Sequence, residues 1–284
     1  MGYVFEDLVR RFNEQANEEA GDHFTPREVI KRMVTLLFTY DDLVYTEGKV
    51  IKIYDPTAGT GGMLSESEKL VVNPETGLNP SANLELFGQE YNPESYAICG
   101  SDLMIKGEDV RNIIYGNTLG TGKAKEGFTD GDGHPNEKFH YMPANPPFGV
   151  EWKPENDHVT REHNEFGFNG RFGPGLPRIT AGALLFLLHM ISKMAPTPKD
   201  GGEGLRIGIV FNGSPSSPGM RVAARATSAA GSLRTTCWKS SSACPTSSST
   251  TLAYPPTSGL SLTGSASSVA VRCSSSTAPT LRGR

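Results

Sequence analysis

The chain has 284 residues, a formal net charge of −4 and a hydrophobic content of 37%, enough for one large domain or two small ones. The acidic balance excludes a broad basic surface, so contact with nucleic acid must be local or come from a partner. The longest apolar run, Ala181 to Met190, is too short to span a membrane. The N-terminus is unlike a signal peptide, and the four cysteines lack disulfide or metal-binding spacing. We therefore expect a cytoplasmic protein of bacterial type, with no membrane contact and no bound metal.

The composition changes near residue 215. From Ser216 to Arg284 the chain has 69 residues, of which 18 are Ser and none is Asp or Glu. Seven Lys and Arg give this tail a charge of +7, so residues 1–215 carry −4 − 7 = −11. We interpret 1–215 as a folded domain and 216–284 as a low-complexity Ser/Thr/Ala-rich tail, which is either frameshifted or disordered.

The N-terminal part predicts two helices. Residues 3–20 show apolar side chains at helical spacing. In the next segment, Thr25 is a good N-cap, Pro26 suits the first helical position and Glu28 completes a capping box. Taken alone, the run His-Phe-Thr-Pro-Arg-Glu is therefore explained as a well-capped helix start.

The following residues alternate between predicted strands and helices, which indicates a mostly parallel, doubly wound α/β sheet. Long polar loops are expected at 120–137 and 150–177. Helices are expected after the Gly-rich turn to about residue 69, at 93–105 and at 180–194. Strands are expected at 49–54, 83–89, 110–115, 139–144 and 205–211.

Residues at three strand ends suggest a nucleotide-like ligand. The turn Asp55-Pro56-Thr57-Ala58-Gly59-Thr60-Gly61-Gly62-Met63 lies between a strand and a helix, where glycines allow close backbone approach. It is neither a P-loop nor a strict GxGxxG. Glu90, at the end of the second strand, suits ribose hydroxyls, but taken alone it is better explained as a solvated charge. Asn117 suits an adenine edge or simply makes a turn.

The run Asn145-Pro146-Pro147-Phe148 follows the fourth strand. Two prolines stiffen the backbone, while the Asn side chain and the Pro146 carbonyl offer acceptors. Phe148 offers a ring for stacking. The arrangement suits a planar amine such as the N6 of adenine, although a proline-rich turn is the simpler interpretation.

Charged residues of the polar loop leave two interpretations open. Arg171 and Arg178 could meet phosphates or face solvent, and His158 with His163 is better explained as a solvated pair than as a metal site.

Several motifs in order resemble the modification (M) subunit of type I restriction–modification systems, an N6-adenine DNA methyltransferase. The resemblance covers about Gly2 to Pro215. NPPF alone also occurs in methyltransferases of RNA bases or of a glutamine amide. The motifs are HFTPREV, DPTAGTGGM, FGQEYNPESYAI, GNTL, NPPFG, GPGLPRI, HMISKM and RIGIVFNGSP.

The resemblance implies a Rossmann-like methyltransferase sheet and S-adenosyl-L-methionine as methyl donor. Asn145 and the Pro146 carbonyl would accept the N6 hydrogens of a flipped adenine, with Pro147 beside them and Phe148 stacked on the base. Glu90 would hold the ribose hydroxyls and Asn117 would lie near the cofactor's adenine. The implied cofactor-binding set is His23, Phe24, Thr25, Pro26, Arg27, Asp55, Thr57, Ala58, Gly59, Gly61, Gly62, Glu90 and Asn117.

The resemblance ends after Pro215, so we expect a sheet that is incomplete at its C-terminal end, and poor solubility or no activity for the chain alone. It implies duplex DNA, a specificity (S) subunit and a restriction (R) subunit as partners. Two alternatives stay open. One is a methyltransferase of RNA or a protein glutamine, and the other is an inactive remnant that only binds nucleotide or partner subunits.

Overall fold

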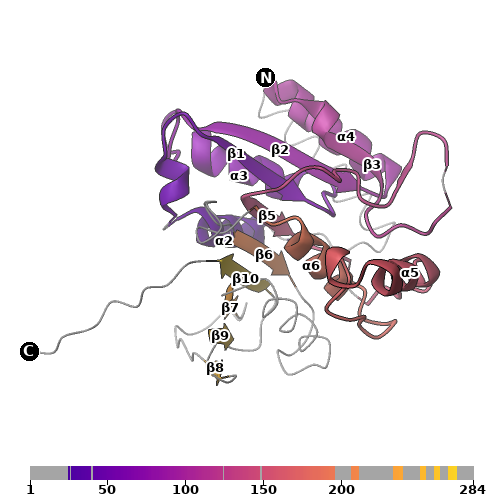
Figure 1. The fold of residues 1–284 in the computed structure, drawn as a ribbon. Helices are drawn as coiled ribbons and strands as arrows, with labels where there is room; N and C mark the ends of the chain where they lie inside the picture. Colours follow the sequence, from indigo (N-terminus) through magenta and orange to yellow (C-terminus); the bar gives the residue numbers. More distant parts are fainter. Residues whose placement is uncertain are drawn as a thin grey trace, which may run out of the picture.

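The computed structural model describes residues 25, 27–39, 41–123, 125–147, 149–195 and 206–210, together with the backbone of four strands between 233 and 273. The helix predicted at 3–20 lies outside the described residues. Figure 1 shows one twisted sheet with helices packed on both of its faces.

The central sheet is parallel from β4 to β6, in the order β4-β3-β2-β1-β5-β6. β1 pairs with β2 on one side and with β5 on the other, so the strand order reverses at β1. This arrangement confirms the predicted doubly wound α/β class. The strands are β1 (Val50–Asp55), β2 (Asn83–Glu90), β3 (Ile113–Asn117), β4 (Thr129–Asp130), β5 (Tyr141–Ala144) and β6 (Arg206–Val210).

From the composition of the tail we expected the sheet to end at β6. Instead, the sheet continues with two strands from the tail. β10 (Ser268–Cys273) pairs antiparallel with β6, and β7 (Leu233–Trp238) pairs antiparallel with β10. The tail also contributes the hairpin of β8 (Thr250–Ala253) and β9 (Gly259–Leu262). The physical reason is that Thr and Val favour extended backbone, whatever reading frame supplied them. The frameshift itself and the domain boundary at 215 stay predictions.

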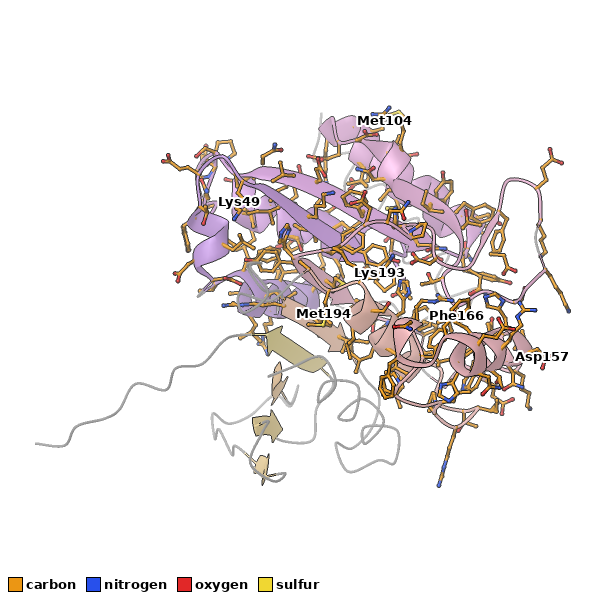
Figure 2. The ribbon with its side chains drawn as sticks, viewed as in Figure 1. Lys49, Met104, Asp157, Phe166, Lys193 and Met194 are labelled. Atoms are coloured by element: carbon orange, nitrogen blue, oxygen red, sulfur yellow. The ribbon has the colours of Figure 1, made fainter. Side chains whose placement is uncertain are left out.

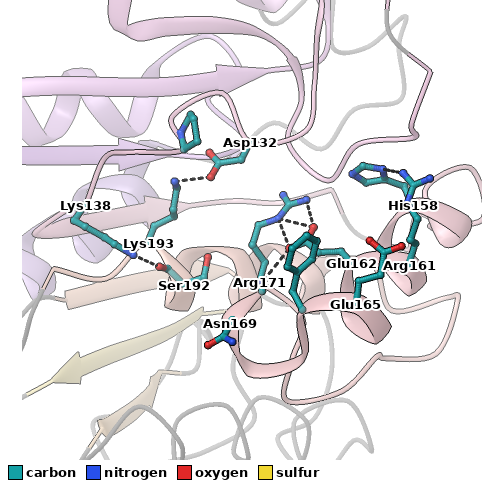
Figure 3. A pocket seen from close by; sticks show the side chains of 13 residues that line it. Asp132, Lys138, His158, Arg161, Glu162, Glu165, Asn169, Arg171, Ser192 and Lys193 are labelled. Carbon is teal, nitrogen blue, oxygen red and sulfur yellow. Dashed lines mark hydrogen bonds and ion pairs between the residues drawn. The ribbon is translucent and has the colours of Figure 1, made fainter.

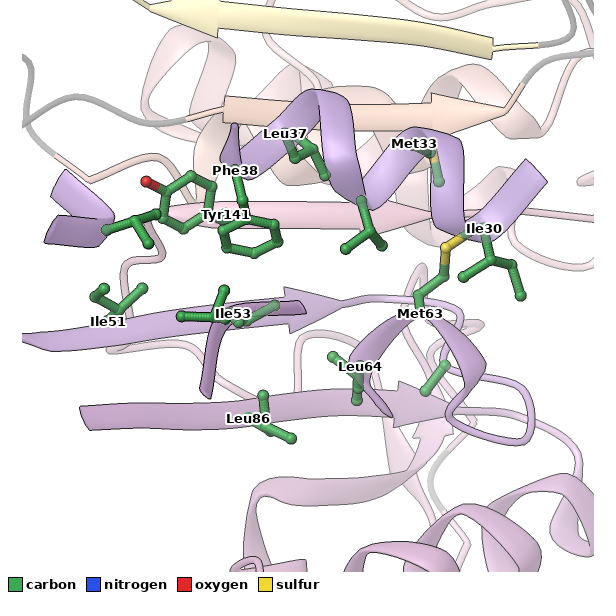
Figure 4. Close-up of a cluster of buried hydrophobic side chains, with 14 of the residues drawn as sticks. Ile30, Met33, Leu37, Phe38, Ile51, Ile53, Met63, Leu64, Leu86 and Tyr141 are labelled. Atoms are coloured by element: carbon green, nitrogen blue, oxygen red, sulfur yellow. The ribbon is translucent and has the colours of Figure 1, made fainter. Parts of the chain in front are cut away.

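Helices α2 (Arg27–Phe38), α3 (Gly62–Val72) and α4 (Pro93–Lys106) cover one face of the sheet. Figure 4 shows α2 side chains facing Ile51 and Ile53 of β1, with Met63 and Leu64 of α3 beside them. Alternate strand residues point this way because side chains of a strand alternate between its two faces. Asn92 caps α4 by accepting from the Glu94 and Ser95 backbone N–H groups. The apolar stripes of these helices therefore face the sheet.

Helix α6 (Ala183–Ser192) covers the opposite face. Its leucines pack against Tyr54, Phe87 and Met142, which belong to three neighbouring strands. Tyr54 and Phe139 stack with ring centroids 4.4 Å apart. The two clusters together make the doubly covered core that a parallel sheet requires.

Two predicted boundaries were wrong. The segment 150–177 is no open loop, because it contains α5 (Asn156–Phe166) and the 3₁₀ turn η3 (Gly167–Asn169). Figure 2 shows Asp157 and Phe166 on this helix. Only Val159 of α5 is buried, so the helix lacks the apolar periodicity that sequence analysis detects. The third strand begins later than expected, since Val110–Asn112 form the 3₁₀ turn η2, and a further 3₁₀ turn, η1 (Asp42–Tyr45), precedes β1.

Candidate functional site at the strand ends

The carboxyl ends of β1, β2, β3 and β5 meet at one edge of the sheet, because these strands run parallel. β1 ends at Asp55, β2 at Glu90, β3 at Asn117 and β5 at Ala144, just before Asn145. This edge, at the reversal of strand order, is where open α/β sheets bind their ligands. The residues predicted from four separate motifs therefore share one edge.

The Gly-rich turn is tightly built. Gly61 has a φ of +84° at the start of α3, a backbone conformation that residues other than Gly rarely adopt. A Cβ on Gly61 would lie 2.9 Å from the Cys99 sulfur of α4. The Gly61 backbone N–H donates to the Ala58 carbonyl at 2.8 Å, and the Ala58 N–H donates to the Gln89 carbonyl at 3.0 Å. These contacts fix the turn against the end of β2.

Glu90 is oriented by backbone groups on both sides. Its carboxylate accepts from the Gly59 N–H and from the Asn92 N–H, each at 2.7 Å. The structure thus brings Glu90 and the Gly-rich turn together, as the sequence predicted. Gly88 permits this approach, since a Cβ there would lie 3.1 Å from the Ala58 Cβ.

Asp55 is a buried carboxyl at the end of β1, with 1% of its surface exposed. Its Oδ1 accepts from the Thr57 N–H at 2.9 Å and from the Thr57 hydroxyl at 3.2 Å. Burial raises the pKa of Asp55 to about 7, because removal from water disfavours the charged form and the nearby Glu90 carboxylate adds repulsion. The Thr57 hydrogen bonds oppose this rise.

Asn145 has an amide fixed in one orientation. Its Nδ2 donates to the Thr25 hydroxyl, although the two residues lie 120 positions apart in the chain. The Asn145 Oδ1 is buried, and no residue in the described part of the chain donates to it. Pro146 is buried beside it, and Pro147 is exposed. The site therefore presents a buried acceptor, and the NH2 group of the same amide donates one hydrogen bond to Thr25.

Asn117 makes the turn that one of the two interpretations predicted. Its Oδ1 accepts from the Leu119 N–H at 3.0 Å and from the Gly120 N–H at 3.3 Å. Its Nδ2 donates to Glu155 of the α5 N-terminus at 3.0 Å. The next residue, Thr118, donates its hydroxyl to the Pro56 carbonyl at 2.7 Å, which joins this turn to the Gly-rich turn. No role was predicted for Thr118, although it lies in the GNTL motif, or for Glu155, which lies outside the recognised motifs.

The remaining predicted residues divide into three groups. Thr57, Ala58 and Gly62 lie in or just after the Gly-rich turn, as expected. Arg27 begins α2 with an exposed side chain. The others, His23, Phe24, Pro26 and Phe148, lie outside the described residues.

Arg171 is buried and paired within the protein, so the interpretation that it faces solvent is wrong. Its side chain is 11% exposed and its Nη2 lies 2.6 Å from the Glu162 carboxylate. Figure 3 shows this pair beside a cavity of about 530 Å³. Lys193 with Asp132, and Arg161 with His158, form further pairs in the cavity wall. None of the predicted cofactor-binding or catalytic residues that the structure describes lines this cavity.

The described residues contain neither a membrane-spanning helix nor a metal-binding cluster. No helix there is long and apolar enough to cross a membrane. In the same part of the chain, no cluster of at least three His, Cys, Asp or Glu side chains is arranged to hold a metal ion.

Solved structures share this fold. A type I restriction–modification system methyltransferase subunit from Streptococcus thermophilus superposes with a TM-score of 0.56 at 16% identity, covering 88% of this chain and 44% of that one. A protein from Listeria monocytogenes, described as a class I S-adenosylmethionine-dependent methyltransferase, gives 0.53 at 10% identity, covering 96% and 69%. The chain therefore shares the Rossmann-like α/β fold of these two methyltransferases.

The family follows from the sequence. The profile of the N-6 DNA Methylase family matches residues 1–215, and the chain belongs to this family. The HindI methylase subunit of a type I restriction enzyme from Haemophilus influenzae is 26% identical over 200 residues, which are 70% of this chain and 38% of the relative. The MpnII methylase subunit from Mycoplasma pneumoniae is 23% identical over 193 residues, 67% of this chain and 32% of the relative. The chain thus spans about a third of the length of these relatives.

Proposed function

We propose that the protein transfers a methyl group from S-adenosyl-L-methionine to N6 of adenine in duplex DNA, as the modification subunit of a type I restriction–modification system. The observation that carries the proposal is the Asn145 amide. Thr25 holds its N–H, and its buried oxygen stays available as an acceptor within the described part of the chain. A buried acceptor without a donor is costly, and an exocyclic amine supplies the missing donor.

The residues at the strand ends fit the cofactor. The glycines of the turn would let its backbone approach a ligand closely, and Gly61 adopts a positive φ that a side chain would disturb. Glu90 would hold the ribose hydroxyls, and the Asn117 turn would lie near the adenine ring. S-Adenosyl-L-methionine supplies an electrophilic methyl group on its sulfonium when it is bound. The buried, largely neutral Asp55 adds little charge at this edge below pH 7.

The chain's own contribution to catalysis is positioning. Asn145 and the Pro146 carbonyl would accept both N6 hydrogens, which directs the nitrogen lone pair toward the methyl group. Phe148 would stack on the base after it leaves the duplex. Fixed orientation contributes up to roughly 7–11 kcal/mol to the barrier reduction in favourable cases. No step requires a proton acceptor stronger than water, because the amine loses its proton after the transfer.

The proposed partners follow from charge and from the relatives. Residues 1–215 carry −11 and would repel DNA phosphates, so a specificity subunit would supply most of the DNA affinity and the sequence recognition. A restriction subunit would complete the complex, as the names of the type I relatives suggest.

The test measures which molecule accepts the methyl group. The protein, together with a DNA-reading specificity subunit encoded beside it, is incubated with S-adenosyl-L-methionine labelled in the methyl group. Duplex DNA, RNA and a total protein extract are offered in separate reactions. We expect label in DNA, recovered as N6-methyladenine after digestion to nucleosides.

The other outcomes decide between the alternatives. Label in RNA or on protein glutamine, with none in DNA, would replace the proposed substrate. Cofactor binding without transfer to any acceptor, even with the specificity subunit present, would identify the chain as an inactive remnant.

A further inference from the structure

We propose that Arg171 is a positioning residue, which holds the turn 117–120 in the shape that the cofactor site requires. The inference rests on the proposed function, because it concerns the same cofactor site. It assigns a role to residues 150–172, which lie between the NPPFG and GPGLPRI motifs and which none of the recognised motifs covers.

The Arg171 guanidinium donates hydrogen bonds to two backbone carbonyls of the turn 117–120. Its Nη1 donates to the Thr118 carbonyl at 2.6 Å, and its Nη2 donates to the Leu119 carbonyl at 3.1 Å. The same group is held by Glu162, which accepts from Nε at 3.0 Å and from Nη2 at 2.6 Å. Glu162 also accepts from the Arg171 backbone N–H at 2.9 Å. Four of the five N–H groups of the planar fork therefore donate to one carboxylate and two carbonyls.

Thr118, whose carbonyl Arg171 contacts, is itself hydrogen-bonded to the Gly-rich turn. The Thr118 hydroxyl donates to the Pro56 carbonyl at 2.7 Å, and this side chain is buried. Arg171 thus fixes the backbone of the residue whose side chain ties the end of β3 to the end of β1. Thr118 therefore joins two turns of the proposed cofactor site. The turn 117–120 would approach the cofactor's adenine, and the Gly-rich turn would approach its methionine part.

Two further contacts reinforce the arrangement. Glu155, at the N-terminus of α5, accepts from Asn117 Nδ2 at 3.0 Å. On the other side, Arg171 Nη1 lies 3.5 Å from His189 Nδ1, and His189 Nε2 lies 3.0 Å from the Tyr54 hydroxyl. Because Arg only donates, His189 Nδ1 accepts and Nε2 carries the hydrogen. Arg171 is thereby connected to Tyr54, the residue before Asp55 on β1.

Lysine cannot substitute for this arginine. An ammonium group is a point charge on a flexible stem and lacks the rigid fork that contacts three acceptors in a plane. Arg171→Lys would keep the charge beside Glu162 but release at least one of the two carbonyls. The turn would then sample other shapes, and ligand binding would have to select the right one.

The experiment measures binding of S-adenosylhomocysteine to the full chain by titration calorimetry. We expect Arg171→Lys to raise Kd by about tenfold or more. In the complex with the specificity subunit, KM for the methyl donor should rise, while kcat changes by less than about threefold. Arg161→Lys is the matched control, because Arg161 lies on α5 and contacts His158 at 3.1 Å without reaching the turn. It should bind like the wild type.

A double variant separates positioning from folding. Arg171→Met with Glu162→Met removes the ion pair without leaving a lone buried charge, which proteins often tolerate. We expect it to unfold at a urea midpoint close to that of the wild type and still bind S-adenosylhomocysteine more weakly. An unchanged Kd in both variants would overturn the inference, leaving Arg171 a purely structural residue. Failure of the wild type to bind S-adenosylhomocysteine would overturn the proposed function, and the inference with it.

Discussion

Asn145 and Asp55 lie at the ends of neighbouring strands, and the fold treats their polar atoms differently. The Asn145 amide is oriented by Thr25, and its oxygen has no donor within the described residues. Asp55 accepts two hydrogen bonds from Thr57 and is fully covered. We infer that Asn145 acts on a ligand, whereas Asp55 shapes the turn beside it.

The titration of Asp55 makes stability depend on pH. Its pKa is raised from 3.8 to about 7 in the folded protein, so the folded state keeps a proton that the unfolded state releases. The stabilisation is fully present below pH 4 and is lost as the pH rises to 7, with a slope of about 1.4 kcal/mol per pH unit. Asp55→Asn should remove this slope, because it keeps an acceptor for Thr57 but cannot ionise.

Urea unfolding of both proteins at several pH values between 4 and 8 checks this prediction. The difference in unfolding free energy between them should grow in favour of the Asn variant across this range and level off above pH 7. Other titrating groups, such as Glu68, are present in both proteins and cancel in the difference. Parallel curves for the two proteins would show that Asp55 is ionised throughout.

At the scale of elements, the sequence predicted those helices, strands and turns whose structure depends on residues that are neighbours in the chain. Strand β1 and the Gly-rich turn were predicted from an apolar run and from glycines, and α4 was predicted without its cap at Asn92. Helix α5 gave no such signal, because Val159 is its only buried residue and its Arg171–Glu162 pair follows no apolar pattern. The hydrogen bond of Thr25 with Asn145 was equally hidden, because it joins segments 120 residues apart.

Gly61 tests the link between the turn and α4. Gly61→Ala would place a Cβ 2.9 Å from the Cys99 sulfur in a backbone of positive φ. We expect a loss of unfolding free energy of about 1–3 kcal/mol and weaker binding of S-adenosylhomocysteine. Urea unfolding and titration calorimetry measure the two effects.

Gly100→Ala is the matched control for this substitution. Gly100 lies inside α4, and a Cβ there would meet nothing within 4 Å. Alanine in a helix interior should stabilise the protein by about 0.5–1 kcal/mol. Equal effects of the two substitutions would show that neither backbone conformation nor the Cys99 contact constrains the turn.

For the whole molecule, the negative charge of residues 1–215 opposes binding to DNA phosphates. This part carries −11, whereas the tail carries +7. A protein that binds DNA by itself neutralises phosphates with a basic surface and releases counterions. The main domain lacks the overall charge for such binding.

We therefore expect the chain alone to bind a labelled DNA duplex weakly, with a Kd above about 10 μM at 150 mM salt. Adding the specificity subunit should tighten binding by at least about a hundredfold. Fluorescence anisotropy with and without that subunit measures both values. Submicromolar binding by the chain alone would show that a local basic surface suffices, and our account of the partner's role would then fail.

The most direct test of the central claim compares Asn145→Ala with Glu90→Ala in the complex with the specificity subunit. Asn145→Ala should lower kcat for methyl transfer to DNA by at least about a hundredfold, while Kd for S-adenosylhomocysteine stays near that of the wild type. Glu90→Ala should chiefly raise that Kd. The reverse pattern, with cofactor binding lost in Asn145→Ala and transfer lost in Glu90→Ala at saturating cofactor, would contradict the roles assigned to the two strand ends.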